Sequence, residues 1–378
     1  MNAKDLPVQI PPSPFELTPD LLTAIISPIV PGAGVSSVTI VKSHEYGDGD
    51  VSTSARATAR LDYADGSPAG LPRDVILKLS FDPGKAGTDA WYCQLDGLFA
   101  NEVNFYNRIR PGLDIEAPRS LGGHFDAVTK RYLLIMEDVT KRGATFPSNL
   151  DEVGVDNVKH ILDAIAKVHA TYWKSERFAG DLSWVETHLA GGVENHMRSV
   201  IPEEGIRSQL ELHKFKRELL ERLGTTEREL FAGMVANKQH QSTLPQTLLH
   251  GDLHIGNTYR MPDFSVGLHD WQLCVKGFAL HDVTYIINTA LSIAERRTHE
   301  RDLLGYYRDK LVEFGVKAPP SLDTLWTEHR RAALWTLYIG WLTCPPESYG
   351  WETMAVALLR VSTAVEDHGT LALVRETL

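Results

Sequence analysis

The chain of 378 residues is long enough for two domains, each with its own hydrophobic core. Its 43% hydrophobic and 23% charged residues are typical of a globular protein. A formal charge of −11 argues against general affinity for nucleic acid or anionic membranes, because both favour an excess of Lys and Arg. No apolar stretch is long enough to span a membrane, and residues 1–17 lack a signal-peptide pattern. We therefore expect a cytoplasmic protein without a nucleic-acid or membrane partner.

The three cysteines do not suggest a metal site or a disulfide framework. Cys93, Cys274 and Cys344 are far apart in the sequence and form no CxxC pair. Cys274 is most simply interpreted as a small buried hydrophobic residue.

The N-terminal part begins with a helix and continues as strands. Thr18-Pro19-Asp20 is typical of a helix start, with an N-cap hydroxyl, a Pro at the first helical position and an acid near the positive helix end. Pro28 opposes the continuation of this helix beyond about Ser27. The β-rich segments Val38–Val41, Ser52–Leu61 and Asp74–Ser80 follow, joined by short polar turns. The sequence therefore predicts an antiparallel meander.

A change of periodicity follows the meander. Residues 98–109 carry apolar side chains at helical spacing, and Tyr132–Met136 is a short apolar strand. Beyond residue 137 the pattern is helical, except for a β-interlude at 247–272. We therefore predict an α+β fold of two lobes: a small, β-rich, nucleotide-binding lobe at 1–137, and a larger, mainly helical lobe at 138–378 for catalysis and acceptor binding.

The most informative motif is His250-Gly251-Asp252-Leu253-His254-Ile255-Gly256-Asn257, which follows the apolar Leu248-Leu249. An Asp, an Asn five residues later and a further Asp at 270 are typical of a kinase-type phosphotransferase. Asp252 can accept a proton from an attacking hydroxyl. The oxygens of Asn257 and Asp270 can hold Mg²⁺ against the phosphates of a nucleotide.

The N-terminal lobe offers candidates for nucleotide binding. Lys78, at a strand end, is expected to contact the α- and β-phosphates and to be held by an ion pair with Glu102, although either residue alone could be a solvated surface charge. The other predicted contacts are Gly47 and Gly49 in the turn, Ser52 or Ser54 as added donors, and the backbone of Glu137–Val139 at the adenine edge.

Several further side chains have a structural interpretation. His250 and His254 are expected to brace the loop, His269 to be structural, and His169 to be a satisfied core histidine. Aromatic residues gather in the C-terminal part, where they can form either a helical core or the wall of a pocket for a bulky alcohol; this set is Trp326, Trp335, Tyr338, Trp341, Tyr349 and Trp351.

The chain resembles the aminoglycoside phosphotransferase/choline kinase superfamily, particularly its ecdysteroid-kinase-like branch. The resemblance rests on residues 249–257, on Asp270-Trp271-Gln272 and on Ile135-Met136-Glu137-Asp138, with support from Lys78 and Glu102 in their local sequences and from residues 169–173. It implies a protein-kinase-like fold, ATP or GTP with Mg²⁺, and transfer of the γ-phosphate to a small-molecule hydroxyl. Unlike in protein kinases, Trp271-Gln272 follows the metal-binding Asp, and no activation loop is recognisable. Both differences from protein kinases favour a permanently assembled site rather than one that is switched by phosphorylation.

Two other functions remain open. A metallophosphoesterase is suggested by Gly-Asp-x-His and the nearby acids, but an early Asp-x-His motif is missing from residues 1–120. A nucleotide-binding module without catalysis is disfavoured because Asp252, Asn257 and Asp270 are all present. The acceptor alcohol, the choice between ATP and GTP and the oligomeric state do not follow from the sequence.

Overall fold

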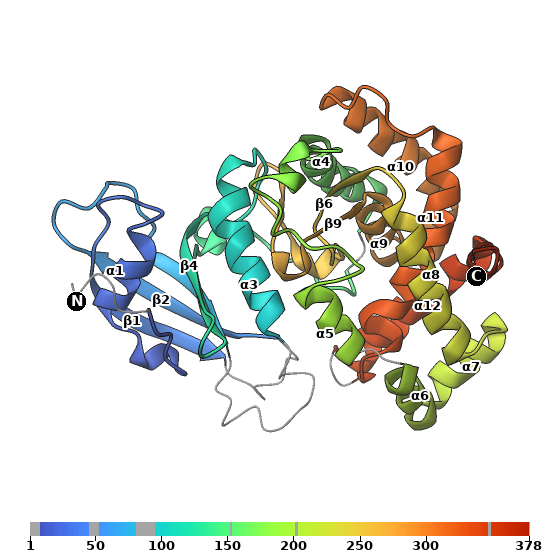
Figure 1. Cartoon of the computed structure of the whole chain (residues 1–378), viewed down its shortest axis with the longest axis horizontal. Coiled ribbons are helices and arrows are strands. Elements are labelled where there is room, and N and C mark those ends of the chain that lie inside the picture. Colours follow the sequence, from blue (N-terminus) through green and yellow to red (C-terminus); the bar gives the residue numbers. More distant parts are fainter. Residues whose placement is uncertain are drawn as a thin grey trace. The chain divides into compact units, whose positions relative to one another are not determined.

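The structure, a computed structural model, describes residues 8–44, 53–80, 95–151, 153–200, 203–346 and 349–377. The chain divides into two compact units (Figure 1). One comprises Met1–Leu113 and Ala117–Thr145, and the other comprises Asp114–Glu116 and Phe146–Leu378. The first is β-rich and the second mainly helical, so the α+β class is confirmed. The lobe boundary at residue 137 stays a prediction; the compact units divide at residue 145.

The first unit is built on a five-stranded antiparallel sheet with strand order β1-β2-β3-β5-β4. Its strands are β1 Val35–His44, β2 Ala55–Tyr63, β3 Asp74–Leu79, β4 Ser120–Asp126 and β5 Arg131–Glu137. The antiparallel meander is therefore confirmed as β1 to β3. The sequence analysis did not anticipate β4, because its Gly122-Gly123 pair interrupts the apolar alternation expected of a strand.

Helix α1, Pro19–Ile26, packs on this sheet. The Thr18 hydroxyl accepts a hydrogen bond from the Leu21 amide, which confirms the predicted N-cap. Leu22, Ile25 and Ile26 are buried in one hydrophobic cluster with alternate residues of β2 and β3. The period of two along each strand places these apolar side chains on the same face as the helix.

The predicted helix between β3 and β4 is also present. It consists of α3, Asp96–Asn104, followed by η3, Phe105–Ile109, and η4, Arg110–Gly112. Leu98, Phe105 and Ile109 are buried as their helical spacing predicted. Helix α3 packs against β4 and β5, next to the end of the strand that carries Lys78.

The second unit contains most of the helices. They are α4 Val155–Thr171, α5 Gly192–Val200, α6 Glu203–Leu212, α7 Lys214–Leu223, α8 Glu227–Ser242, α9 Leu280–Ala290, α10 Ile293–Glu313, α11 Leu322–Leu337, α12 Trp351–Asp367 and α13 Thr370–Arg375. Helices α6, α7 and α8 belong to the helical pattern predicted beyond residue 137. Gly224 ends α7 in the left-handed region at φ 63°, which a glycine adopts without the usual steric cost.

Two small antiparallel strand pairs interrupt these helices. The pair β6, Gln246–Leu249, and β9, Val275–Phe278, encloses the pair β7, Thr258–Arg260, and β8, Val266–Leu268. The predicted β-interlude is therefore present and extends to residue 278. The order of strand, loop and hairpin determines where the motif residues lie.

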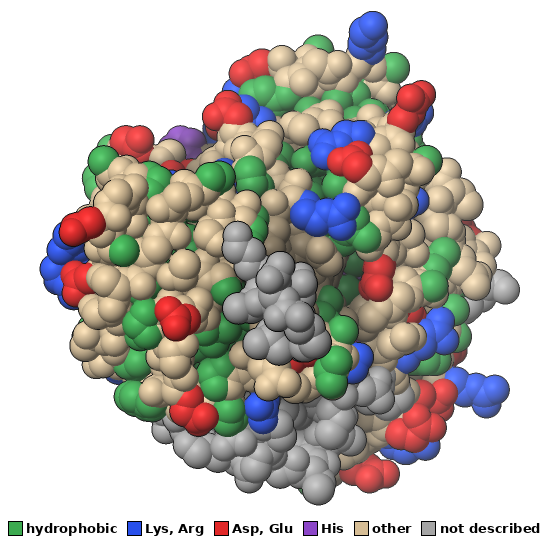
Figure 2. Space-filling view, turned by 60° about the vertical axis from the view of Figure 1, so that its left-hand side comes forward, with side chains coloured by type: hydrophobic (Ala, Val, Ile, Leu, Met, Phe, Trp, Pro, Cys, Tyr) green, Lys and Arg blue, Asp and Glu red, His purple; other side chains and the backbone are tan. Residues whose placement is uncertain are grey.

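The aromatic residues of the C-terminal part do not share one environment. Trp335, Tyr338 and Trp341 are buried, whereas Tyr349 and Trp351 are exposed. The set is therefore a mixture of core and surface residues. Acidic and basic side chains are interspersed over the face in Figure 2. Among the described residues, no helix combines the length and apolarity that a transmembrane span requires.

Candidate active site

The motif of residues 250–257 forms a loop between β6 and β7. β6 ends at Leu249, and Gly251 then turns the chain at φ 85°. A Cβ at this position would lie 2.0 Å from the carbonyl oxygen of Leu273, so only glycine fits both the backbone angle and the space. The short η7, Ile255–Asn257, closes the loop.

A buried carboxylate holds the beginning of this loop. The backbone amides of His250 and Gly251 donate to Asp282 Oδ2 and Oδ1 at 2.7 and 3.0 Å. Asp282 lies in α9 and is fully buried. Nε2 of His169 lies 3.2 Å from Oδ2, and its Nδ1 lies 2.8 Å from the Tyr307 hydroxyl. These bonds confirm that His169 is a satisfied core histidine.

The charge of Asp282 is compatible with its burial because of these partners. Burial alone would raise the pKa of this carboxyl. The hydrogen bond from His169, with the favourable effects of the surrounding imidazoles, outweighs burial, and the pKa lies below its ordinary value. Asp282 is therefore an ionised anchor for two backbone donors of the loop.

The imidazole of His250 bridges two parts of the site. Its Nε2 lies 2.9 Å from the backbone carbonyl of His269, and its Nδ1 accepts from the Asp252 amide at 3.3 Å. This pattern requires the neutral tautomer with the proton on Nε2. Burial lowers the pKa of His250 and keeps it neutral, although the charges of Asp282, Asp252 and Asp270 act in the opposite direction. The prediction that His250 braces the loop is thus confirmed.

Asp252 and Asn257 are hydrogen-bonded to each other across the loop. Asn257 Nδ2 donates to the backbone carbonyl of Asp252 at 2.8 Å and to Asp252 Oδ2 at 3.1 Å. These bonds fix the amide orientation, so Asn257 Oδ1 is directed away from Asp252. The Asp252 side chain keeps 20% of its surface exposed, enough for contact with a ligand.

The β7–β8 hairpin brings Asp270 to the same region. Thr258 pairs with Leu268, and the amide of His269 donates to the carbonyl of Asn257 at 3.1 Å. Asp270 follows directly, with φ 64° and ψ 63°. Asp is one of the few residues besides glycine that adopt this left-handed conformation readily. The hairpin therefore brings the backbone of Asn257 next to that of His269, the residue before Asp270. Both Asn257 and Asp270 have side-chain oxygens of the kind that a hard cation prefers.

His254 lies beside the carboxylate of Asp252. Its Nδ1 accepts from the Gly256 amide at 3.1 Å, and its Nε2 lies 3.8 Å from Asp252 Oδ2. The ring packs near Tyr285 and Trp341, with centroid distances of 5.9 and 6.1 Å. The bracing role predicted for His254 is confirmed for the turn at Gly256. Both aromatic side chains are buried, so this side of the loop packs against the core.

The first unit contains the predicted ion pair of Lys78 and Glu102. Lys78 Nζ lies 2.9 Å from Glu102 Oε1 and 2.8 Å from Oε2. Both side chains are nearly fully buried, which excludes the alternative of solvated surface charges. Burial of a charge pair costs free energy unless the geometry of the pair is good. The packing of α3 on the sheet holds the two side chains in this geometry.

The remaining predicted nucleotide contacts differ in position. Gly47, Gly49 and Ser52 lie outside the described residues. Glu137 ends β5 and accepts hydrogen bonds from the Arg119 amide and from Arg142. Val139 begins the short η5, Val139–Arg142. The roles of all these residues stay predictions.

Asp282 is not among the site residues predicted from the sequence. A signal was present, because Asp282 is an acid within the apolar run of α9, Leu280–Ala290. A charged side chain in a helix that is buried on every side needs partners. The partners lie 31 and 32 residues away along the chain, and no local pattern connects them.

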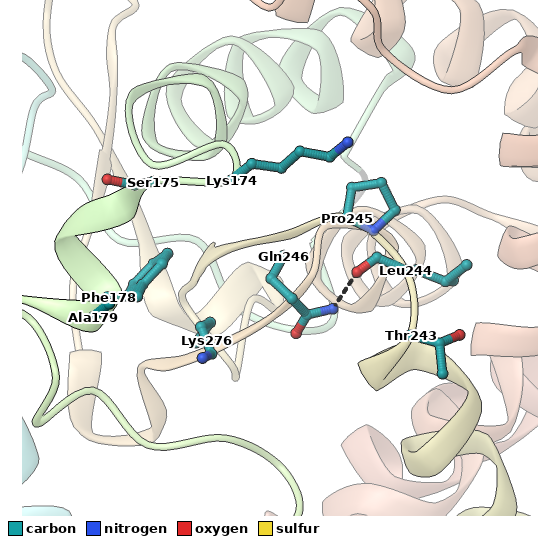
Figure 3. A pocket seen from close by; sticks show the side chains of 9 residues that line it. All are labelled: Lys174, Ser175, Phe178, Ala179, Thr243, Leu244, Pro245, Gln246 and Lys276. Atoms are coloured by element: carbon teal, nitrogen blue, oxygen red, sulfur yellow. Dashed lines mark hydrogen bonds between the residues drawn. The ribbon is translucent and has the colours of Figure 1, made fainter.

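A surface hollow lies at the other end of β6 from the motif loop. It has a volume of about 480 Å³ and is lined by Lys174, Ser175, Phe178, Ala179, Thr243, Leu244, Pro245, Gln246 and Lys276. In Figure 3 the Gln246 amide is bonded to the carbonyl of Leu244, and Lys174 extends away from Lys276. The polar groups do not converge, and none of the predicted site residues lines this hollow.

Comparisons with solved structures found similar chains at low sequence identity. A macrolide 2′-phosphotransferase from Brachybacterium faecium is 16% identical, with a TM-score of 0.41, over 88% of this chain and 93% of the other. An ethanolamine kinase from Plasmodium vivax is 11% identical, with a TM-score of 0.46, over 90% and 83%. A choline/ethanolamine kinase family protein from Mesorhizobium loti is 14% identical, with a TM-score of 0.44, over 90% and 93%.

The sequence comparisons identify the family of the protein. No curated protein sequence matches the chain. The model of the ecdysteroid kinase-like family matches residues 47–318, which include the motif loop, Asp270 and Asp282. The match covers more than half of the chain and confirms the predicted two-lobed, protein-kinase-like fold. The protein therefore belongs to the ecdysteroid kinase-like family.

Proposed function

We propose that the protein transfers the γ-phosphate of a nucleoside triphosphate to a hydroxyl group of a small molecule, with Mg²⁺. The observation that carries the proposal is the hydrogen-bonded pair of Asp252 and Asn257 on a loop anchored by Asp282. Phosphoryl transfer depends mainly on positioned groups and neutralised charge. A loop fixed through its backbone supplies such positioning.

The donor set of the second unit suits Mg²⁺. The orientation of the Asn257 amide leaves Oδ1 for a metal, and Asp270 adds a carboxylate from the neighbouring hairpin. Both are oxygen ligands, which a hard cation prefers. Mg²⁺ held by Asn257 and Asp270 would neutralise negative charge on the phosphates of the nucleotide.

Asp252 is the proposed catalytic base. Its Oδ2 is held by Asn257 Nδ2, so the carboxylate has a fixed direction. It would orient the acceptor hydroxyl and accept its proton as the oxygen attacks phosphorus, an effect generally worth about 10²–10⁴ in rate. In the first unit, Lys78 is proposed to contact the α- and β-phosphates, with Glu102 holding its ammonium group in place. Gly47, Gly49, Ser52, Glu137 and Val139 remain proposed nucleotide contacts.

The acceptor is proposed to be a small-molecule alcohol, and the nucleotide ATP or GTP. The cytoplasmic location stays a prediction. No observation favours the metallophosphoesterase: among the described residues, the one cluster of at least three His, Cys, Asp or Glu ligands does not include Asp252.

The proposal is tested by a screen of alcohols with γ-labelled ATP and GTP in the presence of Mg²⁺. We expect transfer of label to at least one alcohol by the wild-type protein. Asp252→Ala should abolish transfer while its nucleotide affinity, measured by calorimetry, stays within a few-fold of wild type. Comparable loss of nucleotide binding would contradict the assignment of Asp252 as the base. Wild-type nucleotide binding without transfer to any alcohol would favour a binding module.

A further inference from the structure

Three buried side chains converge in the second unit, on helices other than those of the candidate active site. They are Glu300 in α10, His329 in α11 and His368, which directly follows α12. Each is at most 6% exposed, and their candidate ligand atoms all lie within 4.8 Å of one another. This is the only such group found among the described residues.

The nitrogen atoms of this cluster are poorly satisfied by protein partners. His329 Nε2 is buried without a hydrogen-bond partner and lies 3.6 Å from Glu300 Oε2, too far for a hydrogen bond. Its Nδ1 lies 2.9 Å from the Thr284 hydroxyl, which accepts a hydrogen bond in the tautomer with the proton on Nδ1. The Nε2 lone pair is then directed toward Glu300.

His368 faces a conflict at one atom. Its Nε2 lies 2.8 Å from Glu300 Oε2, which only accepts, and 3.2 Å from Arg296 Nη1, which only donates. A single imidazole nitrogen cannot both donate to the carboxylate and accept from the guanidinium. One of these two close contacts is therefore not a hydrogen bond. The site is also shielded from water, which could otherwise act as a partner.

We propose that Glu300 Oε2, His329 Nε2 and His368 Nε2 form a structural binding site for a divalent transition metal, with Zn²⁺ as the best match. Tetrahedral zinc with nitrogen and carboxylate ligands has ligand-to-ligand distances of roughly 3.3 Å. The distances of 2.8 and 3.6 Å from Glu300 to the two imidazoles lie on either side of this value. Zinc uses the lone pairs of both nitrogens, which removes the conflict at His368.

Arg296 is the group that must yield. Its Nη1 donates to Glu300 Oε2 at 2.7 Å, where the metal would bind. Its Nη2 contacts Asp367, so the guanidinium keeps an acidic partner when it moves away from Glu300. Thr284, in α9, would orient His329 from behind, as the outer hydrogen-bond partner of a metal-binding histidine commonly does. The metal would join α9, α10, α11 and the end of α12 at one point.

This site differs chemically from the proposed Mg²⁺ site. Two imidazoles select a borderline-soft metal, whereas Asn257 and Asp270 offer oxygen only. The two sites are therefore distinguished by which variant loses which metal. The proposal does not depend on the phosphotransferase activity.

The test is zinc titration of the full-length protein after dialysis against a chelator, with bound metal measured by elemental analysis. We expect one equivalent of Zn²⁺ on the wild type, a higher melting temperature when it binds, and the visible spectrum of tetrahedral Co²⁺ on substitution with cobalt. His329→Gln should lose the equivalent. His240→Gln, which alters a histidine bonded to Glu328 outside the cluster, is the matched control and should retain it. Asp270→Ala should also retain it.

Two results would overturn the proposal. One is a wild-type protein that binds no stoichiometric Zn²⁺ and gives no tetrahedral cobalt spectrum, which would identify Arg296 as the resident cation of a metal-free network. The other is equal binding by His329→Gln and the wild type. If His329→Gln does not fold, Glu300→Gln replaces it, and the cobalt spectrum of the wild type still decides the question.

Discussion

The carboxylate of Asp282 accepts a 2.7 Å hydrogen bond from the backbone amide of His250. A second bond from the next amide makes this contact bidentate, and both partners are fully buried. The anchor acts on the backbone rather than on the catalytic side chains. Asp252 and Asn257 lie two and seven positions after His250 in the chain. They are therefore positioned by Asp282, a helix residue that itself has no access to a ligand.

Asp282→Asn should weaken both the fold and the proposed activity. An amide cannot accept from two backbone donors with both of its side-chain atoms, and the charge that favours these bonds is lost. We expect the free energy of unfolding to fall by about 3 kcal/mol, the scale for breaking a buried charged network. Chemical denaturation measures this change. Asp302→Asn, on the exposed side of α10, is the control, and an equal loss in both variants would refute the anchoring role.

Gly251→Ala should be destabilising by at least about 2 kcal/mol, because the position combines a positive φ with a Cβ contact of 2.0 Å to the Leu273 carbonyl. Gly305→Ala is a matched change in α10, where no atom lies within 4 Å of the added Cβ. It should stabilise the protein by about 0.5–1 kcal/mol through helix propensity. Thermal unfolding of both variants checks the pair. A tolerated Gly251→Ala would show that the loop conformation is not required.

Stability should fall in mild acid because of buried neutral histidines. Burial lowers the pKa values of His188, His250 and His281 in the folded protein. In the unfolded chain a histidine titrates near about 6.5. Below this pH the unfolded state binds more protons than the folded state, so the free energy of unfolding decreases as pH falls from about 6.5. Denaturation curves between neutral pH and pH 5 measure the slope.

A substitution separates this effect from general acid sensitivity. His188→Gln removes one of the three imidazoles whose pKa is lowered and should make the slope shallower. His160 is exposed, and His160→Gln is the control that should leave the slope as in the wild type. Identical slopes in all three proteins would show that His188 does not contribute.

Lys78→Met should affect nucleotide use and the stability of the first unit together. The substitution leaves the buried Glu102 without the ammonium 2.8 Å away, at a cost of several kcal/mol. Adding Glu102→Gln should recover part of the stability but not the nucleotide affinity. Calorimetric titration with Mg²⁺-nucleotide and denaturation of both variants provide the two measurements. Recovery of affinity in the double variant would exclude a phosphate contact for Lys78.

Local features of the fold could be predicted from the sequence. The N-cap at Thr18, the β1 to β3 meander and the β7–β8 hairpin depend on residues that are neighbours in the chain, so their signals are local. The order of Asp252, Asn257 and Asp270 along the chain is also a local signal. The hydrogen bonds between Asp252 and Asn257 form within one tight loop, and the following hairpin leads the chain to Asp270.

Contacts between distant segments could not be predicted in this way. β4 contains two glycines and pairs with β5, so its strand conformation depends on its neighbour rather than on its own propensity. The anchor at Asp282 and the cluster of Glu300, His329 and His368 join helices that only the tertiary fold brings together. Periodicity identifies the buried face of a helix but not the partner that meets it.

Calorimetric titration with ATP and GTP, each with and without Mg²⁺, tests the central claim most directly. The account predicts that the wild type binds at least one of these nucleotides tightly only when Mg²⁺ is present. In Asp270→Asn, Mg²⁺ should no longer increase the nucleotide affinity, because the substitution weakens a metal ligand but keeps the hairpin. Binding that is indifferent to Mg²⁺ in the wild type, or unchanged in Asp270→Asn, would contradict a metal-nucleotide site at Asn257 and Asp270.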